Sequence, residues 1–207
     1  MTIHAGLASR EAVARPSAAL APATGAMEAP GGNGNIEDWP NARLVRDAHL
    51  DLIWEGTSNI NALDAVQRAV GKVGAHRALR DDLATRLDDT QGLPGQFRSR
   101  LDGAISSALR FAEEVAAHPE NERFCRVAAG ELYHAVTAAL FIQEGLRLGA
   151  AGGDVRRLLL ACFVIKHRLD GPNTLSLEGQ RWEDEAIDLL LGEPPVPLFR
   201  ATALLVK

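Results

Sequence analysis

Apolar residues recur three and four positions apart through most of this chain, and this spacing predicts helices rather than strands. One helix is expected to start at Thr57 or Ser58, either of which can cap it, and to end at Val70, before Gly71. Its apolar face consists of Ile60, Leu63, Val66 and Val70. We expect that face to pack against a core.

The part of the chain before this helix predicts a flexible segment followed by a helix start. Up to Pro30 the sequence is rich in Ala, Pro, Ser and Gly, which predicts a flexible segment with a marginal helical turn over residues 7–15. Asp38-Trp39-Pro40 is typical of a helix start, because proline in the first turn loses no hydrogen bond. A short helix is therefore expected over residues 41–48.

Helical periodicity continues to the end of the sequence. Further helices are expected over residues 75–88, 101–118, 122–148, 155–169 and 176–191. The apolar stripes expected for three of them are Leu101, Ile105, Leu109, Ala112 and Val115; Phe124, Val127, Leu132, Val136, Leu140 and Leu146; and Trp182, Ala186, Leu189 and Leu190. Residues 198–206 fit either a strand or a helix. Because no alternating strand series is present, the pattern predicts an all-α antiparallel helical bundle.

Composition narrows the class of protein. The 207 residues are 46% hydrophobic, which is enough for one domain with a tail. A formal net charge of -5 gives no general attraction to nucleic acid or to anionic membranes. Cys125 and Cys162 lie in apolar helical patterns without CxxC spacing, which indicates buried reduced thiols. Since no window approaches 18 uninterrupted apolar residues, we expect a soluble cytoplasmic protein.

The most informative stretch runs from Gly31 to Asp64 and reads GGNGNIEDWPNARLVRDAHLDLIWEGTSNINALD. It resembles the carboxyl-terminal signature of flavin-dependent acyl-CoA dehydrogenases, which has a GGxG turn, an acidic-aromatic-Pro turn, an RDA element and an EGT element, in this order. Trp54, the EDWP turn and the long helical extension look most like the branch of that family that includes the adaptive alkylation-response flavoproteins.

Glu55 is the candidate catalytic base of this signature. A carboxylate can take a proton from a weakly acidic carbon when an apolar site raises its pKa and the developing enolate oxygen is hydrogen-bonded. Glu55 follows the apolar run Leu52-Ile53-Trp54 and precedes Gly56, which lets a substrate approach the backbone. The matching glutamate of the family removes the α-proton of an acyl-CoA thioester. The resemblance therefore implies that Glu55 is the base and that Gly56 contacts the substrate.

The resemblance implies FAD as the cofactor and acceptor of the β-hydrogen. In such enzymes the GGxG turn approaches the FAD of a neighbouring subunit. The cofactor contacts implied for this chain are Glu28, Gly31, Gly32, Thr57 and Asn59. The implied partners are an acyl-CoA substrate and either further copies of the chain in a homo-oligomer or a separately encoded flavin-domain protein. Arg46-Asp47 matches the RDA element, and we interpret it as a structural ion pair or cap.

The resemblance divides the chain into three parts. Residues 1–30 are the flexible segment, residues 31–71 match the end of the acyl-CoA dehydrogenase carboxyl-terminal domain, and residues 72–207 form a helical extension packed on it. In the family, a helical domain and a β-barrel that holds the flavin ring precede the signature, so we expect a truncated or partial chain. Arginines alternate with acids between residues 72 and 110, which indicates no nucleic-acid partner.

The same residues also have simpler interpretations. Glu55 alone is typical of a surface glutamate near a helix start, and the glycines of the GGxG turn alone are typical of a flexible turn. His49, His134 and His167 lack the spacing of metal ligands, which indicates surface or core positions. Two functions remain. One is an acyl-CoA dehydrogenase-type oxidoreductase with FAD as acceptor, and the other is a non-catalytic helical remnant or scaffold that acts through protein-protein assembly.

Overall fold

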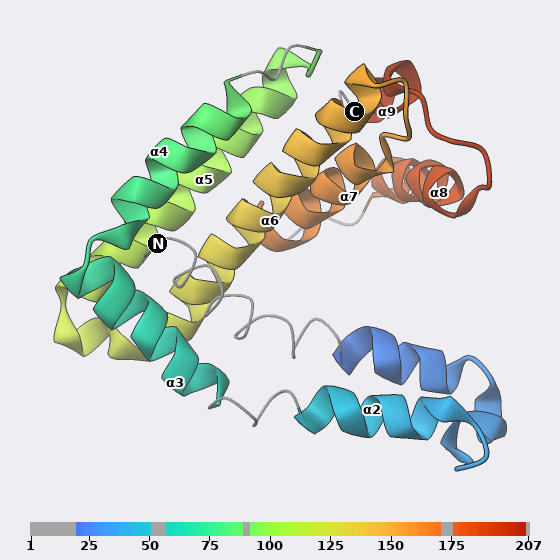
Figure 1. Ribbon diagram of the computed structural model, residues 1–207, viewed down its shortest axis with the longest axis horizontal. Helices are drawn as coiled ribbons and strands as arrows, with labels where there is room; N and C mark the ends of the chain where they lie inside the picture. The colour runs from blue at the N-terminus through green and yellow to red at the C-terminus, as the bar shows by residue number, and fades with distance from the viewer. Residues whose placement is uncertain (1–19, 51–56, 89–91, 171–175, 206–207) are drawn as a thin grey trace. The chain divides into compact units, whose positions relative to one another are not determined.

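The computed structural model describes residues 20–50, 57–88, 92–170 and 176–205, and every regular element in these ranges is helical (Figure 1). The predicted all-α fold is therefore confirmed. The chain divides into two compact units. The first consists of Met1–His76 and Ala112–Tyr133, and the second of Arg77–Phe111 and His134–Lys207.

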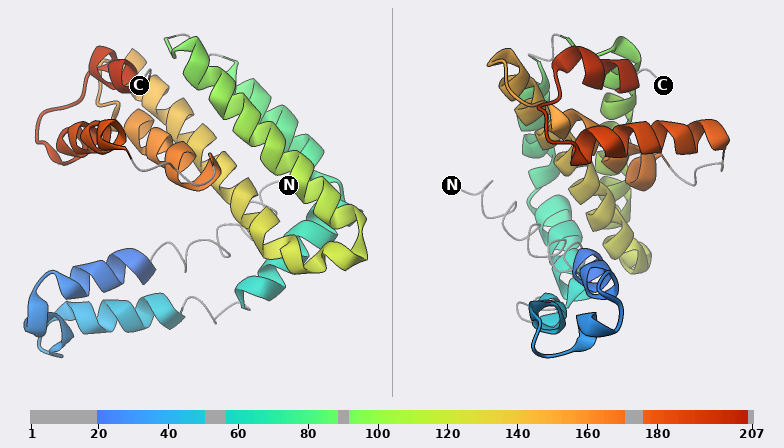
Figure 2. Two further views of the ribbon diagram at one scale, coloured as in Figure 1. Left: turned by 180° about the vertical axis from the view of Figure 1, so that it is seen from behind. Right: turned by 90° about the vertical axis from the view of Figure 1, so that its right-hand side faces the viewer.

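The first unit begins with a helical segment that the sequence did not predict. Residues 20–28 are helical, so the expected flexible segment up to residue 30 is wrong over this part. Pro22 and Gly25 concealed the helix, whereas its alanines, at positions 21, 23 and 26, have the highest helix propensity. This helix lies beside α2, Pro40–Leu50, in two opposite views (Figures 1 and 2). The short helix expected over residues 41–48 is thus confirmed, with one to two more residues at each end.

A 3₁₀ turn at Gly31–Asn35, labelled η1, connects these two helices. Gly31 has a φ of +61°, a left-handed conformation that glycine adopts without steric cost. Gly34 is buried, and a Cβ atom placed on it would lie 1.7 Å from the carbonyl oxygen of Met27. The GGxG spacing therefore has a structural cause here, because a larger residue would be strained by the positive φ at Gly31 and would collide with the backbone of Met27 at Gly34.

The helix expected up to Val70 is present, but its second half is π-helical. It starts as α3, Ser58–Leu63, and continues as η2, Asp64–Lys72. The amide of Val73 bonds the carbonyl of Arg68 at 3.0 Å, a π-type i to i+5 bond that widens the turn. The buried face is consequently Ala62, Ala65, Val66, Ala69 and Val70. The inward position expected for Ile60 is wrong, since this side chain is 59% exposed.

The remaining part of the first unit packs on η2. Gly71 lies inside η2, where an added Cβ atom would stand 3.3 Å from the Cβ of Ala116. Gln67 donates to the Sγ atom of Cys125 at 3.6 Å, and Cys125 is a buried free thiol as expected. Gly74, with a φ of +69°, follows the helix and takes the terminating role that was expected of Gly71.

Most of α4, Ala75–Leu87, and most of α5, Gly95–Ala117, belong to the second unit, and the two helices lie side by side (Figures 1 and 2). Leu79, Leu83 and Leu87 of α4 are buried. The apolar stripe expected for α5 is confirmed, because all of its members are at most 7% exposed: Leu101, Ile105, Leu109, Ala112 and Val115.

The longest helix, α6, spans Cys125–Ala150 after a 3₁₀ turn at Pro119–Phe124, labelled η3. Its expected apolar stripe is wrong in part, since Phe124, Val127 and Leu140 are exposed. The buried face is formed mainly by small residues: Cys125, Ala128, Ala129, Leu132, Ala135, Val136, Ala138, Ala139 and Ile142. Small side chains let neighbouring helix backbones approach closely.

Two glycines bring α6 against the next helix. That helix is α7, Arg156–Val164, which continues as the π-helical segment η4, Ile165–Leu169. A Cβ atom on Gly145 would stand 2.9 Å from side-chain atoms of Leu158, and one on Gly149 would stand 2.8 Å from Val155. Leu158 and Val155 are fully buried in this contact.

The last two helices, α8 (Leu177–Leu191) and α9 (Leu198–Leu205), both contact α7. The hydroxyl of Ser176 caps α8 by accepting from the amide of Gly179 at 3.0 Å. Trp182 is buried, as expected, and its indole N–H donates to the carbonyl of Leu204 at 2.9 Å. The closing segment is a helix, which decides between the two expected possibilities. None of the helices in the described ranges is long and apolar enough to span a membrane.

Arg156 ties the start of α7 to the end of α8. Its side chain is 24% exposed and pairs with Asp154. The guanidinium also donates to three backbone carbonyl oxygens, those of Leu189 at 3.0 Å, Gly192, and Pro194 at 2.8 Å. All of these acceptors would otherwise need other donors at a helix end.

Asp154 forms further hydrogen bonds in this cluster around Arg156. Its Oδ1 atom accepts from the amide of Arg156 at 3.0 Å and from the amide of Val196 at 3.2 Å. Asp154 therefore acts near the start of α7, although Val155 occupies the cap position itself. The amide of Val155 donates to the carbonyl of Val196 at 3.1 Å. The connection between α8 and α9 is thus held by Asp154, Val155 and Arg156 together.

Candidate functional site

The expected site residues lie in the first unit, and those that the structure describes are exposed: Glu28, Gly31, Gly32, Thr57 and Asn59. Thr57 occupies the cap position of α3, and Asn59 lies in its first turn. Glu28 ends the helical residues 20–28, and Gly31 and Gly32 follow in the turn η1. Glu55 and Gly56, the expected base and substrate contact, lie outside the described residues.

The turn η1 exposes its backbone at two glycines. No atom lies within 4 Å of the position that a Cβ would take on Gly31 or on Gly32. A ligand can therefore approach the main chain at these two residues, which is the property that a phosphate or a flavin contact needs. This geometry is compatible with the cofactor contacts that the resemblance implies for Gly31 and Gly32.

Arg46 of the RDA element forms the structural ion pair that was expected. Its guanidinium makes two bonds to the carboxylate of Glu37, at 2.6 and 3.0 Å, and so connects α2 to the turn before it. The bonds with Arg46 lower the pKa of Glu37 and those with Glu37 raise the pKa of Arg46. Asp47 lies 3.6 Å from Arg43 instead. These contacts are exposed, so they position the turn more than they stabilise the fold.

Residues 16–71 match the family model of the acyl-CoA dehydrogenase C-terminal domain. The chain is also similar to acyl-CoA dehydrogenase family member 11 of Caenorhabditis elegans, with 30% identity over 89 residues. These residues make up 43% of this chain and only 14% of that relative. No solved structure matches the chain. The acyl-CoA dehydrogenase match thus contains the whole signature and begins upstream of it, so that it also includes the helical residues 20–28.

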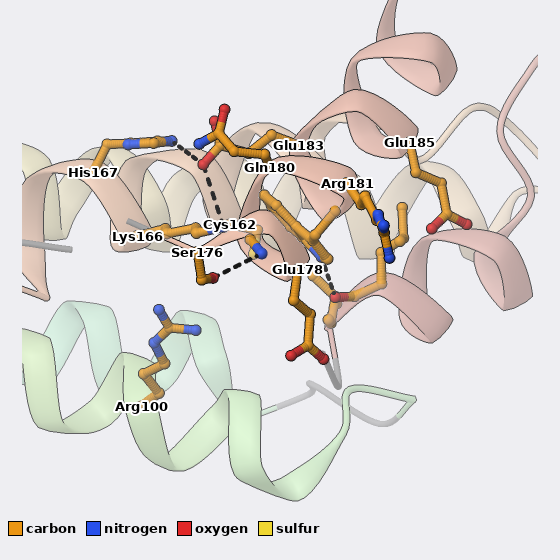
Figure 3. Close-up of a pocket in the computed structure, with 14 residues that line it drawn as sticks. Arg100, Cys162, Lys166, His167, Ser176, Glu178, Gln180, Arg181, Glu183 and Glu185 are labelled. Atoms are coloured by element: carbon orange, nitrogen blue, oxygen red, sulfur yellow. Dashed lines mark hydrogen bonds and ion pairs between the residues drawn. The ribbon is translucent and has the colours of Figure 1, made fainter. Parts of the chain in front are cut away.

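The second unit has a cavity of about 630 Å³ that lies outside the acyl-CoA dehydrogenase match (Figure 3). Helices α5, α7, α8 and α9 and the segment η4 line it. Lys166 and His167 of η4 point toward Glu183 of α8, and Glu183 Oε1 lies 3.3 Å from Lys166 Nζ and 3.4 Å from His167 Nε2. Lys166 also lies over the ring of Trp182, 4.2 Å from its centroid. Sequence reasoning missed this cluster.

The charges on the wall of this cavity balance. Arg100, Lys166 and Arg181 contribute three positive charges, and Glu178, Glu183 and Glu185 contribute three negative charges. Arg100 also pairs with Asp170. Because the formal charges cancel, the lining of the cavity carries no net charge.

Cys162 is the nucleophile candidate of this cavity, and the structure argues against that role. Burial raises the pKa of the Cys162 thiol to about 11, even though Arg100 and Lys166 act to lower it. At neutral pH the sulfur therefore carries its proton, whereas a nucleophilic cysteine needs to be a thiolate. Cys162 is a core residue of α7, which agrees with the expected buried reduced thiol.

The raised pKa of Cys162 predicts a pH-dependent stability. In the unfolded chain the thiol ionises near its ordinary value of about 9, so the unfolded state loses the proton first as the pH rises. The stabilising effect is complete below that value and is lost between about pH 9 and 11. We expect the free energy of unfolding, measured in urea, to be lower at about pH 10 than at about pH 8. This decrease should be about 1 kcal/mol larger in the wild type than in Cys162→Ala. An equal loss in both proteins would exclude Cys162 as the source.

The histidines that the structure describes form no ligand cluster. The ring of His49 lies 2.9 Å from the carbonyl oxygen of Val45, one helical turn earlier. Burial, and to a smaller extent Arg168, lowers the pKa of His134. In the described ranges no group of three His, Cys, Asp or Glu residues is placed to hold a metal ion.

Proposed function

We propose that this protein takes part in the α,β-dehydrogenation of an acyl-CoA thioester with FAD as acceptor. The observation that carries the proposal is the ordered signature from Gly31 to Asp64, which falls entirely inside the match to the acyl-CoA dehydrogenase C-terminal domain. The all-α fold of the described residues agrees with that domain. Trp54 and the helical extension favour the adaptive-response branch of the family.

In this proposal Glu55 takes the α-proton of the substrate. The C–H bond at the α-carbon breaks, and the proton passes to the carboxylate of Glu55. Gly56 leaves room for the thioester beside the backbone, so that main-chain N–H groups can donate to its carbonyl oxygen. FAD supplies the acceptor for the β-hydrogen. The residues that would contact it are Thr57, Asn59, Glu28, Gly31 and Gly32, and all five are exposed.

The proposed assembly needs a source for the remaining flavin contacts. The matched relative is a much longer protein, of which the similarity covers 14%. A second copy of this chain or a separately encoded flavin-domain protein would supply those contacts. The exposure of Gly31 and Gly32 supports this arrangement, because their backbone is open to a group bound by another polypeptide.

A non-catalytic assembly function is the alternative. The observation that favours it is the limited extent of the family match, which covers residues 16–71, while the second unit has a core of its own. In this case the signature would retain its structural role, in which Gly34 and the Arg46–Glu37 pair hold the turn beside α2.

Flavin retention distinguishes the two functions. We expect the purified chain, titrated with FAD and passed through gel filtration, to retain the flavin and to lose its visible absorbance when an acyl-CoA is added without oxygen. Flavin absorbance and fluorescence of the protein fraction measure both steps. A protein fraction without flavin, also when the chain elutes as an oligomer, would contradict a flavin site built from copies of this chain alone and favour the assembly function.

A further inference from the structure

A second hollow, of about 530 Å³, lies between α8 and α9 in the second unit. We call it the α8–α9 groove. One side is formed by Glu185, Asp188 and Leu189 of α8, which are spaced three and four positions apart and so share a face. The other side is formed by Phe199, Arg200 and Ala203 of α9, and Pro194, Pro195 and Val196 form the base. None of these residues belongs to the acyl-CoA dehydrogenase match, which ends at residue 71.

Hydrogen bonds from the start of α7 hold the backbone at the base of the groove in place. Arg156 donates to the carbonyl oxygens of Leu189 and Pro194, at 3.0 and 2.8 Å, and Val155 donates to that of Val196 at 3.1 Å. Pro194, Pro195 and Pro197 further restrict the backbone of this connection. A surface that is ordered before binding loses little entropy when a partner docks. The α8–α9 groove is therefore pre-organised.

A large apolar side chain of the groove wall is left uncovered. Phe199 is 72% exposed. An apolar side chain of this size is stabilised when another molecule removes it from water. Leaving Phe199 in water beside a hollow is typical of a surface that another molecule covers.

The charge of α8 indicates the character of that molecule. Five exposed acids lie on α8 or directly after it, namely Glu178, Asp184, Glu185, Asp188 and Glu193, whereas Arg181 is the single arginine or lysine of the helix. Across the groove α9 carries Arg200. The negative charge therefore predominates around an apolar hollow, and it would attract a positively charged partner and repel a negatively charged one.

We propose that the α8–α9 groove docks a basic amphipathic helix of a partner protein. Its apolar side chains enter the hollow beside Phe199 and Leu189, and its lysines or arginines lie against the carboxylates of Asp188 and its neighbours. This is helix-in-groove recognition, in which apolar residues give affinity and charges give orientation. The proposal does not depend on the dehydrogenase function, because it uses no residue of the signature.

A synthetic peptide tests the proposal directly. The probe is a fluorescein-labelled peptide of leucine and lysine at helical spacing, about 18 residues or five turns long. A peptide of the same composition with scrambled order serves as the matched control. We expect the full chain to raise the fluorescence anisotropy of the amphipathic peptide at a concentration at least about tenfold lower than for the scrambled one. Equal binding of both peptides would overturn the proposal, because it would show attraction by net charge alone.

Variants locate the site. The first variant, Phe199→Ala, removes the apolar wall of the groove. The second variant combines Asp188→Lys with Glu193→Lys and reverses the charge of both side chains. Because all three side chains are exposed, we expect both variants to fold like the wild type. Each variant is expected to weaken peptide binding about tenfold or more, with unchanged circular dichroism. The control is Asp81→Lys with Asp88→Lys, the same charge change at exposed positions in and just after α4. Equal weakening by the control, or no weakening by Phe199→Ala, would overturn the assignment.

A second copy of the chain is the competing occupant. Sedimentation of the unliganded protein over a range of concentrations distinguishes it. We expect Phe199→Ala to leave the sedimentation coefficient unchanged. Dissociation of an oligomer by this single substitution would overturn the proposal of a basic partner and assign the groove to self-association.

Discussion

Replacing Arg156 by alanine is expected to destabilise the second unit by about 3 kcal/mol. The substitution removes hydrogen bonds from a charged donor, each of which contributes about 1.5–3 kcal/mol. It also leaves the carboxylate of Asp154, which is 32% exposed, without its guanidinium partner. The three carbonyl oxygens that Arg156 satisfies would have to find water at the partly buried end of α8. The measurement is urea unfolding followed by far-ultraviolet circular dichroism.

The neighbouring arginine provides the control for this prediction. Arg157 forms a single pair with Glu144 at 2.7 Å, and both side chains are more than 40% exposed. Arg157→Ala should therefore cost less than about 1 kcal/mol. The loss of unfolding free energy for Arg156→Lys should fall between those of the two alanine variants. Lysine keeps the positive charge, but its ammonium group cannot donate to several carbonyl oxygens as the planar guanidinium does. Equal midpoints for Arg156→Ala and Arg157→Ala would show that the cluster does not stabilise the fold.

The second large effect concerns catalysis. Glu55→Gln is expected to reduce acyl-CoA-dependent flavin reduction by a factor of roughly 100 to 10,000, because the amide keeps the shape of the side chain but cannot take a proton. Flavin binding should remain, since the proposed role of Glu55 is proton transfer. The measurement is the rate of flavin bleaching under anaerobic conditions, with retained FAD determined in the same sample.

Asp47→Asn is the matched substitution within the signature. It also converts a carboxylate into an amide, but Asp47 is exposed and its contact is the 3.6 Å pair with Arg43. Its rate of flavin bleaching should equal that of the wild type. If Glu55→Gln bleaches as fast as Asp47→Asn, the assignment of Glu55 as the base is wrong.

The sequence predicted the fold well where large apolar residues mark the buried face. In α5, Leu101, Ile105 and Leu109 are bulky and regularly spaced, and the structure buries all of them. In α6 the pattern was misleading. There the buried face consists largely of alanines, which are common on every face of a helix, and the conspicuous Val127 and Leu140 are exposed.

The functional regions differ in how much a sequence can reveal. The signature could be read directly, because its residues are contiguous and their order is specific. Lys166 and Glu183 could not be paired, since they lie on different helices and the π-helical turn of η4 changes which residues share a face. The contacts of Arg156 leave no pattern at all, because its partners at Leu189, Gly192 and Pro194 are backbone carbonyls that every residue has.

The π-helical segment η2 has a consequence for chain length. A helix closed by i to i+5 bonds holds more residues per turn than an α-helix, so Asp64–Lys72 contains a residue that α-helical geometry does not require. Deleting one residue there would let the segment close with ordinary i to i+4 bonds, while Gly74 could still make the turn into α4. The helix at the end of the signature can therefore lose a residue without a change in the path of the chain.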